Sequence, residues 1–504
     1  MWKNIALITL VLFLIFYVFL RKKLKKYGEE LVKRSSIKAI RQFRVRVERF
    51  KLTRKKYIKF QLLKEVEIWE EMNNYAKENN ITREEALDRV ESYIDEILPF
   101  FNVLSYYKFG YVLAKFLLNL VYNVVIDKEY FKPITKIPKN SVVIYIMNHR
   151  SNADYLLVSY MLAEHIALSF AVGEWARIWP LEYVFKSFGS YLIRRKYRER
   201  LYHKVLEKYI QLISKNGITQ GIFIEGGLSR DGRIRDTKIG LLDYILLTKK
   251  DPDFTKDLIF VPTAINYDRV LEDLNLIREI GGAEPEKRGI KKILSGLALI
   301  VKIPKVVIRN GFYYIFKGVR KYGYTSVAFG TPISLDRYIE EYCSDIFKLP
   351  RKERLAEVKK FADYVMKRVA VVIPITPVPL LSYAILKDGR NRIPEIDLIQ
   401  SMTDIKNELI AKDARIVMGN DFLDLMKEKQ KIEDMEDDRT MELVNFEYGV
   451  IEIEEMQKTM DLALEVLSLR KIAKKKKKEI RLNTDRMEVL EYYSNSIIHL
   501  FESF

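Results

Sequence analysis

The stretch at residues 148–154 reads Asn-His-Arg-Ser-Asn-Ala-Asp and joins two segments of different character. The run before it, Val142 to Met147, is short, apolar and rich in β-branched residues, which is typical of a buried strand. The segment after it, Tyr155 to Leu162, carries apolar side chains in a pattern compatible with a helix. The sequence therefore predicts a strand that ends at His149 and a helix that opens at Asp154.

The pair His149 and Asp154 has the chemistry of a base and its orienting acid. Across a tight loop, the carboxylate can fix the tautomer of the imidazole and stabilise the imidazolium that forms when the ring takes a proton. The same spacing also fits a loop histidine beside an aspartate that caps a helix. Taken alone, the pair leaves both interpretations open.

Composition indicates a folded chain with an excess of positive charge. The 504 residues are 48% hydrophobic and 12% aromatic, which argues against disorder and allows two or three domains. The 87 Lys and Arg residues against 68 Asp and Glu give a formal net charge of +19. That charge suits an acidic membrane surface, a phosphorylated substrate or nucleic acid. Because no nucleic-acid-binding module is recognised, we expect no nucleic acid as a partner.

Residues 1–26 predict a membrane anchor. Ile5 to Leu20 is an uninterrupted apolar run, and basic residues crowd into the segment Arg21 to Lys26 directly after it. A cleaved signal peptide would carry its charge before the run and small residues after it. We therefore expect a single retained anchor with the rest of the chain on the cytoplasmic face of the membrane, since basic flanks stay inside.

The single cysteine, Cys343, excludes a disulfide framework and a cysteine-rich metal site. No histidine is near it in the sequence, so we expect a small buried residue rather than a nucleophile. The four histidines show no metal-ligand spacing. The sequence therefore predicts neither a metal nor a cofactor.

After the anchor, the chain divides into three regions by texture. Residues 27–130 predict a helical region, in which Thr82 and Glu85 have the spacing of a capping box. Residues 131–345 alternate short β-branched runs with helices and glycine turns, which is typical of an α/β domain. Residues 346–504 predict a second helical region. Candidate strands are Val142 to Met147, Gly221 to Glu225, Leu258 to Asn266 and Ser326 to Gly330.

Residues 189–195 form a second motif, a glycine turn into an apolar stretch that ends in Arg194 and Arg195. Guanidinium groups match phosphate oxygens in a bidentate manner, so the pair suits a phosphate pocket. A solvated helix start would explain the same residues. The last motif in chain order is the strand Ile259 to Asp268. It contains Pro262, which predicts a bend or an edge.

Residues 225–230 read Glu-Gly-Gly-Leu-Ser-Arg and follow an apolar strand. The glycines, including Gly226, allow the backbone to approach a ligand closely, while Ser229 and Arg230 offer a hydroxyl and a charged fork. A simple turn with glycine at positive φ would account for the glycines without a ligand.

In this order and spacing, the motifs resemble the four motif blocks of the glycerol-3-phosphate acyltransferase family. The branch that the chain resembles also holds dihydroxyacetone-phosphate acyltransferases. Similarity continues in Gly330-Thr331-Pro332-Ile333 and in the Thr-Pro block at Thr376. The family usually has Arg where this chain has Leu228, which leaves the acyl acceptor open.

The resemblance implies an α/β acyltransferase domain with a mixed central sheet flanked by helices. It implies transfer of an acyl group from acyl-CoA or acyl carrier protein to the sn-1 hydroxyl of glycerol 3-phosphate, giving lysophosphatidate at an anionic phospholipid membrane. By this resemblance His149 is the general base and Asp154 orients it. The implied acceptor site consists of Arg194, Arg195 and Arg230 for the phosphate, and Glu225, Gly226 and Ser229 for the pocket.

Two alternatives remain. One is acylation of dihydroxyacetone phosphate or a lysophospholipid. The other is a non-catalytic, basic, membrane-anchored binding protein whose binding would be indifferent to His149. The basic aromatic stretch Val301 to Tyr324 fits either an interfacial surface or an ordinary amphipathic helix. The basic run Lys474 to Lys478 fits a solvated loop or a contact with anionic lipid.

Overall fold

The computed structural model describes residues 50, 55–101, 106, 110–126, 131–138, 140–163, 168–177, 181–194, 197–280, 321–417 and 438–502. The expected anchor at residues 1–26, Arg195 and most of the basic aromatic stretch lie outside the described residues. Within the described ranges, no helix combines the length and the apolar character needed to cross a membrane.

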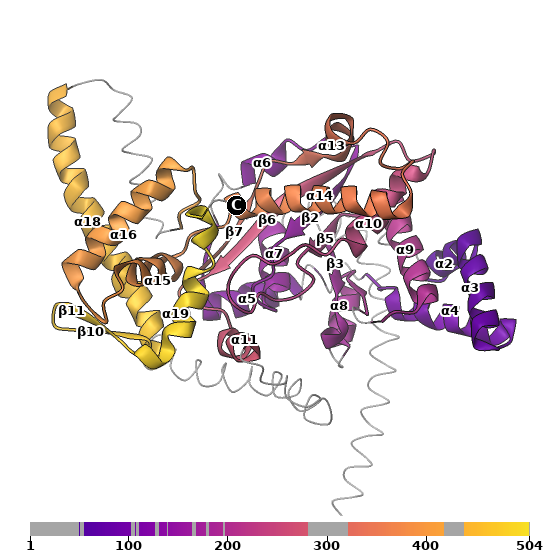
Figure 1. Ribbon diagram of the computed structural model, residues 1–504, viewed down its shortest axis with the longest axis horizontal. Coiled ribbons are helices and arrows are strands. Elements are labelled where there is room, and N and C mark those ends of the chain that lie inside the picture. Colours follow the sequence, from indigo (N-terminus) through magenta and orange to yellow (C-terminus); the bar gives the residue numbers. More distant parts are fainter. Residues whose placement is uncertain are drawn as a thin grey trace, which may run out of the picture.

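An eight-stranded sheet runs through the middle of the molecule in the order β1-β7-β6-β2-β5-β3-β4, and β8 pairs with β6 (Figure 1). Strand β2 is parallel to both β5 and β6, whereas β6 is antiparallel to β7, so the sheet is mixed as expected. The strands are β1 (Asn123–Val125), β2 (Ser141–Met147), β3 (Ser169–Val172), β4 (Tyr191–Leu192), β5 (Gln220–Phe223), β6 (Asp257–Tyr267), β7 (Tyr324–Phe329) and β8 (Ile333–Ser334).

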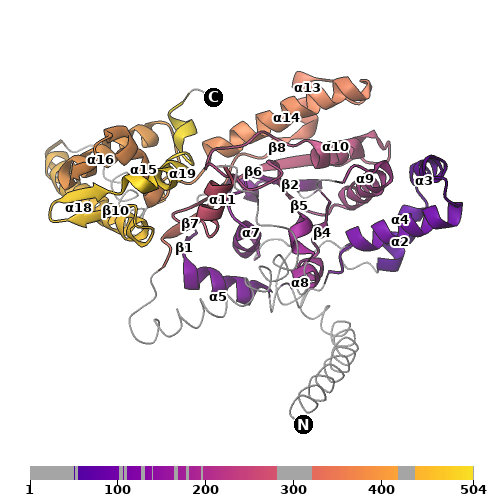
Figure 2. The same cartoon turned by 60° about the horizontal axis from the view of Figure 1, so that its bottom comes forward.

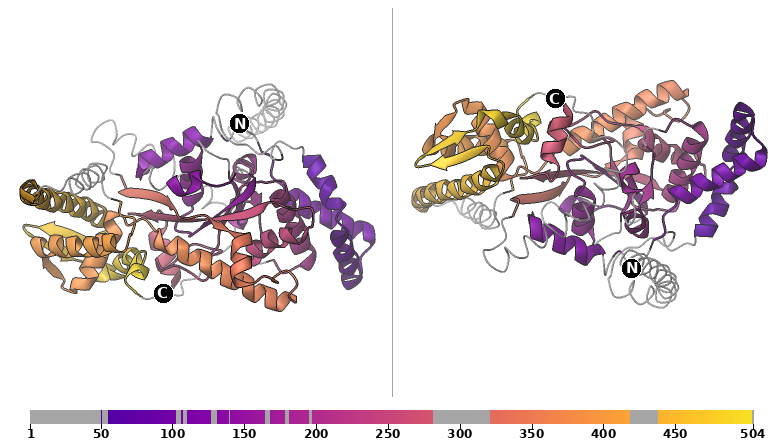
Figure 3. Two further views of the ribbon diagram at one scale, coloured as in Figure 1. Left: turned by 90° about the horizontal axis from the view of Figure 1, so that it is seen from above. Right: turned by 90° about the horizontal axis from the view of Figure 1, so that it is seen from below.

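Helices cover both faces of this sheet, because successive side chains of a strand point to opposite sides. In β2, Val143 and Tyr145 enter one core while Val142 and Ile144 enter the other. The first core includes α5 (Tyr111–Val121) and α7 (Asp154–Leu162), and the second includes α9 (Arg200–Lys215), α10 (Gly240–Leu246) and α14 (Arg351–Val371). Figure 3 shows the sheet from its edge, with α5 and α14 on opposite sides. A strand buried on both faces explains the continuous apolar run before His149.

Several elements differ from the sequence-based expectation. The sheet begins with β1, upstream of the expected domain start at residue 131, and α14 packs on β2 and β6 although it lies beyond the expected end at residue 345. Cys343 is only partly buried, where α13 (Leu335–Tyr342) ends. The remaining short helices are α6 (Lys132–Thr135), α8 (Leu181–Ser187), α11 (Asp273–Ile280), η4 (Glu174–Ala176), η5 (Leu247–Lys250), η6 (Thr484–Arg486) and η7 (Ile498–Leu500).

The sequence predicted a bend or an edge at Pro262. Pro262 lies inside β6, an interior strand, so the edge position was wrong and the bend stays a prediction. On one side β6 pairs with β2 from Asp257 to Thr263. On the other side it pairs with β8 at Ile259 and Phe260 and with β7 from Thr263 onward. The Pro262 carbonyl accepts a hydrogen bond from Gly330 on this second side. Proline therefore removes a donor where the neighbouring strand changes, and no ladder bond is lost.

The N-terminal helices α2 (Lys55–Leu63), α3 (Val66–Asn79) and α4 (Arg83–Ile97) lie at the β4 end of the sheet and pack on α9 (Figure 2). The capping box between Thr82 and Glu85 is present, as the sequence predicts. This region is helical within the described residues 55–101, so its local pattern was sufficient to predict it.

The C-terminal region lies at the opposite end of the sheet and combines helices with a small sheet (Figure 2). Its helices are α15 (Pro377–Asp388), α16 (Glu395–Ala411), α18 (Asp438–Leu469) and α19 (Met487–Ser494). Three strands pair in the order β10-β11-β9, namely β9 (Arg392–Pro394), β10 (Ala473–Lys476) and β11 (Glu479–Leu482). The basic run Lys474 to Lys478 thus forms a strand and its turn, which a purely helical expectation missed.

Candidate active site

The His149 loop and the Glu225 loop meet at the carboxyl ends of the strands β2 and β5. Strands β2 and β5 are parallel neighbours, so their carboxyl ends lie side by side. The backbone N–H of His149 donates to Oε1 of Glu225 at 3.1 Å, and the N–H of Ser229 donates to the His149 carbonyl at 3.0 Å. Two motifs that are 76 residues apart in the chain are therefore in direct contact.

The His149 ring and the Asp154 carboxylate form a buried pair. Nδ1 of His149 lies 2.9 Å from Oδ2 of Asp154, and the two side chains are 2% and 0% exposed. The same Oδ2 accepts the N–H groups of Arg150 at 2.7 Å and Ser151 at 3.0 Å, while Oδ1 accepts the Tyr267 hydroxyl at 2.7 Å. Because Oδ2 of Asp154 accepts two backbone N–H groups and acts as an acceptor, Nδ1 of His149 donates to it and Nε2 carries the basic lone pair.

Aromatic neighbours fix the plane of the imidazole. The His149 ring stacks on Phe223 at a centroid distance of 4.0 Å and an interplanar angle of 22°. Tyr155 meets the ring edge-on at 5.7 Å. Phe223 is the last residue of β5 and Tyr155 lies in the first turn of α7, so both orienting rings come from rigid elements. The ring is thereby held in one direction before any substrate binds.

Two residues that sequence reasoning did not assign to the site connect it to β6. Asn148 donates to the Ile265 carbonyl at 3.0 Å and accepts from the Ile265 N–H at 2.8 Å. Tyr267, at the end of β6, holds Asp154 as described above. The sequence feature that could have identified these residues is a polar residue at the end of each apolar strand. Such residues lie close together when their strands are neighbours in the sheet.

Glu225 lies buried in the Gly-rich loop with both oxygens bonded to the backbone. Oε2 accepts the Arg235 N–H at 3.2 Å, and Oε1 accepts from His149. Burial raises the pKa of Glu225 to about 8, opposed by the hydrogen bond from His149 and by the charge of Arg150. Gly226 adopts a φ of 67°, the left-handed conformation that favours glycine, and Ser229 Oγ donates to the Arg233 carbonyl at 2.7 Å. These contacts give the loop a defined shape beside His149.

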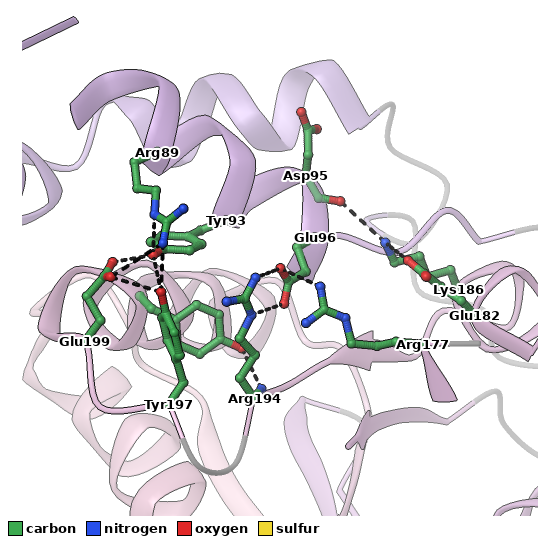
Figure 4. A network of polar contacts seen from close by, with 11 residues as sticks. Arg89, Tyr93, Asp95, Glu96, Arg177, Glu182, Lys186, Arg194, Tyr197 and Glu199 are labelled. Carbon is green, nitrogen blue, oxygen red and sulfur yellow. Dashed lines mark hydrogen bonds and ion pairs between the residues drawn. The ribbon is translucent and has the colours of Figure 1, made fainter. Parts of the chain in front are cut away.

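Two of the three arginines assigned to phosphate, Arg194 and Arg230, have carboxylate partners in the structure. Arg194 faces Glu96 of α4 (Figure 4): its Nε lies 2.7 Å from Oε1 and its Nη2 contacts Oε2. Arg177 contacts the same carboxylate at 2.8 Å. Arg230 is exposed, and its Nε donates to Glu279 at 2.8 Å. The structure thus brings His149, Asp154, Glu225, Gly226 and Ser229 together, but engages Arg194 and Arg230 elsewhere.

The C-terminal region contacts the Gly-rich loop directly. Gly232 has a φ of 86°, and a β carbon there would overlap the carbonyl oxygen of Tyr492 in α19. Asn495 donates to the Asp231 carbonyl at 2.9 Å. Nη1 of Arg150 contacts the Gly232 carbonyl, and its guanidinium lies 5.5 Å from the centroid of the Tyr492 ring. Nothing in the sequence pairs residue 232 with residue 492, so this contact could not be anticipated.

Metal-ligand types do not cluster in the part of the chain that the structure describes. There, no three His, Cys, Asp or Glu side chains are arranged to hold a metal ion. Among the histidines, His203 contacts the Tyr197 carbonyl at 2.7 Å and His499 contacts the Ala370 carbonyl at 2.9 Å. Of these three histidines, His149 is the one whose ring is paired with a carboxylate, that of Asp154, in the geometry of an acid–base pair.

Two family models match the chain. The model "Acyltransferase" matches residues 130–266, and the model "Glycerol-3-phosphate acyltransferase C-terminal region" matches residues 311–503. The first contains the His149 and Glu225 loops, and the second contains α19. Together they include both sides of the contact between Gly232 and Tyr492.

Curated relatives carry the name glycerol-3-phosphate acyltransferase. That of Aeromonas hydrophila is 24% identical over 449 residues, which cover 88% of this chain and 49% of the relative. That of Glaesserella parasuis is 31% identical over 285 residues, covering 56% and 32%. A solved structure, the 1-acyl-sn-glycerophosphate (LPA) acyltransferase PlsC from Thermotoga maritima, is 16% identical with a TM-score of 0.28 and covers 52% of this chain and 77% of that chain. The chain spans half or less of the length of the two relatives, and by its two matched regions it belongs to the glycerol-3-phosphate acyltransferase family.

Proposed function

We propose that this protein transfers a fatty acyl group from an acyl thioester to the primary hydroxyl of glycerol 3-phosphate. The observation that carries the proposal is the buried hydrogen bond of 2.9 Å between Nδ1 of His149 and Asp154, at the carboxyl end of β2. It presents Nε2 of an oriented imidazole as a base. The names of the curated relatives support glycerol 3-phosphate as the acceptor.

The reaction is a direct displacement at the thioester carbonyl. Nε2 of His149 takes the proton of the acceptor hydroxyl while the hydroxyl oxygen forms the new C–O bond. Asp154 stabilises the imidazolium that results. The C–S bond then breaks, and the sulfur leaves as a thiol with the proton that the imidazolium returns. The products are lysophosphatidate and the free thiol of CoA or acyl carrier protein, and no acyl-enzyme is needed.

The Gly-rich loop completes the proposed acceptor pocket. Glu225 accepts the N–H of His149 and the N–H of Ser229 donates to the His149 carbonyl, so the position of the base depends on this loop. Gly226 has a φ of 67°, and a β carbon there would lie 2.8 Å from Cγ of Lys238, so this turn of the loop requires glycine. Dihydroxyacetone phosphate offers the same hydroxyl and the same phosphate, and it is the alternative acceptor within this proposal.

The test is an acyl-transfer assay on membranes that contain the full chain. Acyl-CoA and acyl carrier protein are each combined with glycerol 3-phosphate and with dihydroxyacetone phosphate. We expect His149→Ala to lower kcat by about 10²- to 10⁴-fold, the contribution typical of a general base. Its melting temperature is measured to establish that it folds.

His203→Ala is the matched control, because His203 lies in α9 and bonds the Tyr197 carbonyl. We expect it to keep the wild-type kcat. A folded His149→Ala variant with near-normal acyl transfer would refute the role of the base. Membranes that acylate neither phosphorylated acceptor would refute the reaction itself.

A further inference from the structure

Arg150 carries a buried guanidinium whose hydrogen bonds are incomplete. The residue is 4% exposed, and Nη1 contacts the Gly232 carbonyl. Its Nε and Nη2 are buried and have no hydrogen-bond partner among the described residues. Buried polar groups in folded proteins nearly always have partners, and an unpaired buried charge costs several kcal/mol. An arginine in this state calls for an acceptor beyond those that the described residues provide.

Three other arginines of low exposure in the described chain each have a carboxylate partner. Arg354 contacts Asp243, and Arg470 contacts Asp273. Arg194 binds Glu96 through Nε and Nη2, the two adjacent donors along one edge of the planar guanidinium group. These are the same two atoms that lack a partner in Arg150. This donor pair fits two oxygens of a carboxylate or a phosphate.

The carboxylates around Arg150 are already committed. Both oxygens of Glu225 accept backbone N–H groups, those of His149 and Arg235. Asp154 accepts from His149, from the backbone of Arg150 and Ser151, and from Tyr267. The Tyr492 ring lies against the guanidinium at 5.5 Å and cannot neutralise it. Among the described residues, Glu225 and Asp154 therefore leave Nε and Nη2 of Arg150 without a carboxylate, and an external anion can supply the acceptor.

We propose that Arg150 binds the phosphate of the acyl acceptor through Nε and Nη2. The assignment rests on the proposed function and deepens it. Arg150 follows His149 in the chain, and one oxygen of Asp154 holds both the His149 ring and the Arg150 backbone N–H. Base and phosphate ligand thus belong to one rigid loop, which suits an acceptor whose hydroxyl and phosphate are a few bonds apart.

This assignment gives the C-terminal region a part in acceptor binding. The Gly232 carbonyl and the Tyr492 ring fix the direction of the Arg150 side chain. Gly232 in turn rests on the backbone of α19. Tyr492 and Gly232 are positioning residues, because they act through Arg150.

The decisive experiment compares an acceptor that has a phosphate with one that lacks it. For wild type and Arg150→Lys, kcat/KM is measured with glycerol 3-phosphate and with glycerol, using one acyl thioester and full-length protein in membranes. We expect Arg150→Lys to lower the ratio of the two kcat/KM values at least about tenfold, because a bidentate charged contact is lost. The loss should appear in KM for glycerol 3-phosphate.

Arg354→Lys is the matched control, since Arg354 is equally buried but paired with Asp243. It should leave the ratio of acceptors unchanged, whatever its effect on stability. An equal loss for both acceptors in Arg150→Lys would overturn the proposal, because only a structural role predicts it. A raised KM for the thioester alone would also overturn it and would assign Arg150 to a phosphate of the donor.

A measurement on the wild type does not depend on the folding of a variant. We expect inorganic phosphate to inhibit competitively against glycerol 3-phosphate, and the inhibition to weaken at least about tenfold in Arg150→Lys if that variant folds. Inhibition competitive only against the thioester would overturn the proposal. If the wild type acylates no phosphorylated acceptor, the proposed function itself fails. If the wild type is active but Arg150→Lys leaves the ratio of the two kcat/KM values unchanged, only the role of Arg150 fails.

Discussion

The two ends of the central sheet are joined to their neighbouring regions by different kinds of contact. At the β4 end, Glu96 of α4 binds Arg194 and Arg177 in a network whose charges are matched (Figure 4). The C-terminal region at the other end reaches the Gly-rich loop, which follows the interior strand β5, through the close approach of Tyr492 in α19 to Gly232, and the adjacent Arg150 keeps two donors unmatched. A matched network holds regions together, whereas an unmatched buried charge is an incomplete binding site. Whether an arginine has a carboxylate partner therefore distinguishes a structural arginine from a ligand-binding one better than its presence in a motif does.

Gly232→Ala tests the α19 end and should have the largest effect. The new methyl group would overlap the Tyr492 carbonyl, and the φ of 86° is strained for any residue other than glycine. The loop must move, and the Gly232 carbonyl then leaves Arg150. We expect kcat/KM for glycerol 3-phosphate to fall about 100-fold or more and the free energy of unfolding to drop by about 3 kcal/mol.

Gly389→Ala is its control, because Gly389 ends α15 with a φ of 78° and has no atom within 4 Å of the added methyl. It should cost only about 1 kcal/mol of stability through backbone strain and leave kcat/KM unchanged. Equal losses of activity in the two variants would mean that the contact with α19 does not matter for the site. Both quantities come from denaturant titration and acyl-transfer assays on the same preparations.

The sequence was sufficient for features that depend on local pattern. The apolar run before His149 and the helix opening at Asp154 were predicted correctly, because each follows from periodicity within a few residues. The strands before His149 and Glu225 were also predicted, but a shared site for their two loops was implied only by the family resemblance, and the direct contact is a finding of the structure. The partner of an arginine has no such local signal. Glu96 is 98 residues from Arg194, so the sequence could not tell that this guanidinium is already paired.

Short strands and the C-terminal sheet were missed for a related reason. Strands β3 and β4 have four and two residues, too few to display a period. Strand β10 consists of Ala473 followed by three lysines and pairs with β11 in a small antiparallel sheet. Its stability comes from pairing and from ion pairs such as Lys475 with Glu395, which β propensity does not anticipate.

Glu225→Gln sharpens the contrast between two glutamates of low exposure, because Glu96 faces guanidinium groups and Glu225 faces backbone N–H groups. Burial raises the pKa of Glu225 to about 8, well above its value in the unfolded chain. Ionisation therefore favours unfolding, and the contribution of Glu225 to stability is lost as pH rises from about 4.5 through about 8. Glutamine does not ionise. We expect the stability advantage of wild type over Glu225→Gln to shrink between pH 6 and pH 9 by up to about 1.4 kcal/mol per pH unit.

Melting temperatures at three or four values of pH measure this difference. Asp251→Asn is a useful control, because Lys215 and the Asp253 N–H lower the pKa of Asp251. Its folded pKa lies below the unfolded one, so its contribution is present above the unfolded pKa and should not change between pH 6 and pH 9. A constant gap for Glu225→Gln over the same range would show that Glu225 is ionised throughout.

Glu96→Gln tests the matched network and should have the smallest effect of the three. The amide replaces a carboxylate that serves Arg194 and Arg177, and Arg194 is 22% exposed, so the loss of stability is limited to about 1–2 kcal/mol. If Arg194 only holds α4 to the sheet, KM for glycerol 3-phosphate stays at the wild-type value. If Arg194 binds phosphate, its release from Glu96 lowers that KM, and the contrast between the two ends fails. Asp95→Asn is the neighbouring control: Asp95 is 54% exposed and pairs with Lys55, so its loss should cost no more than about 0.5–1 kcal/mol and leave KM unchanged.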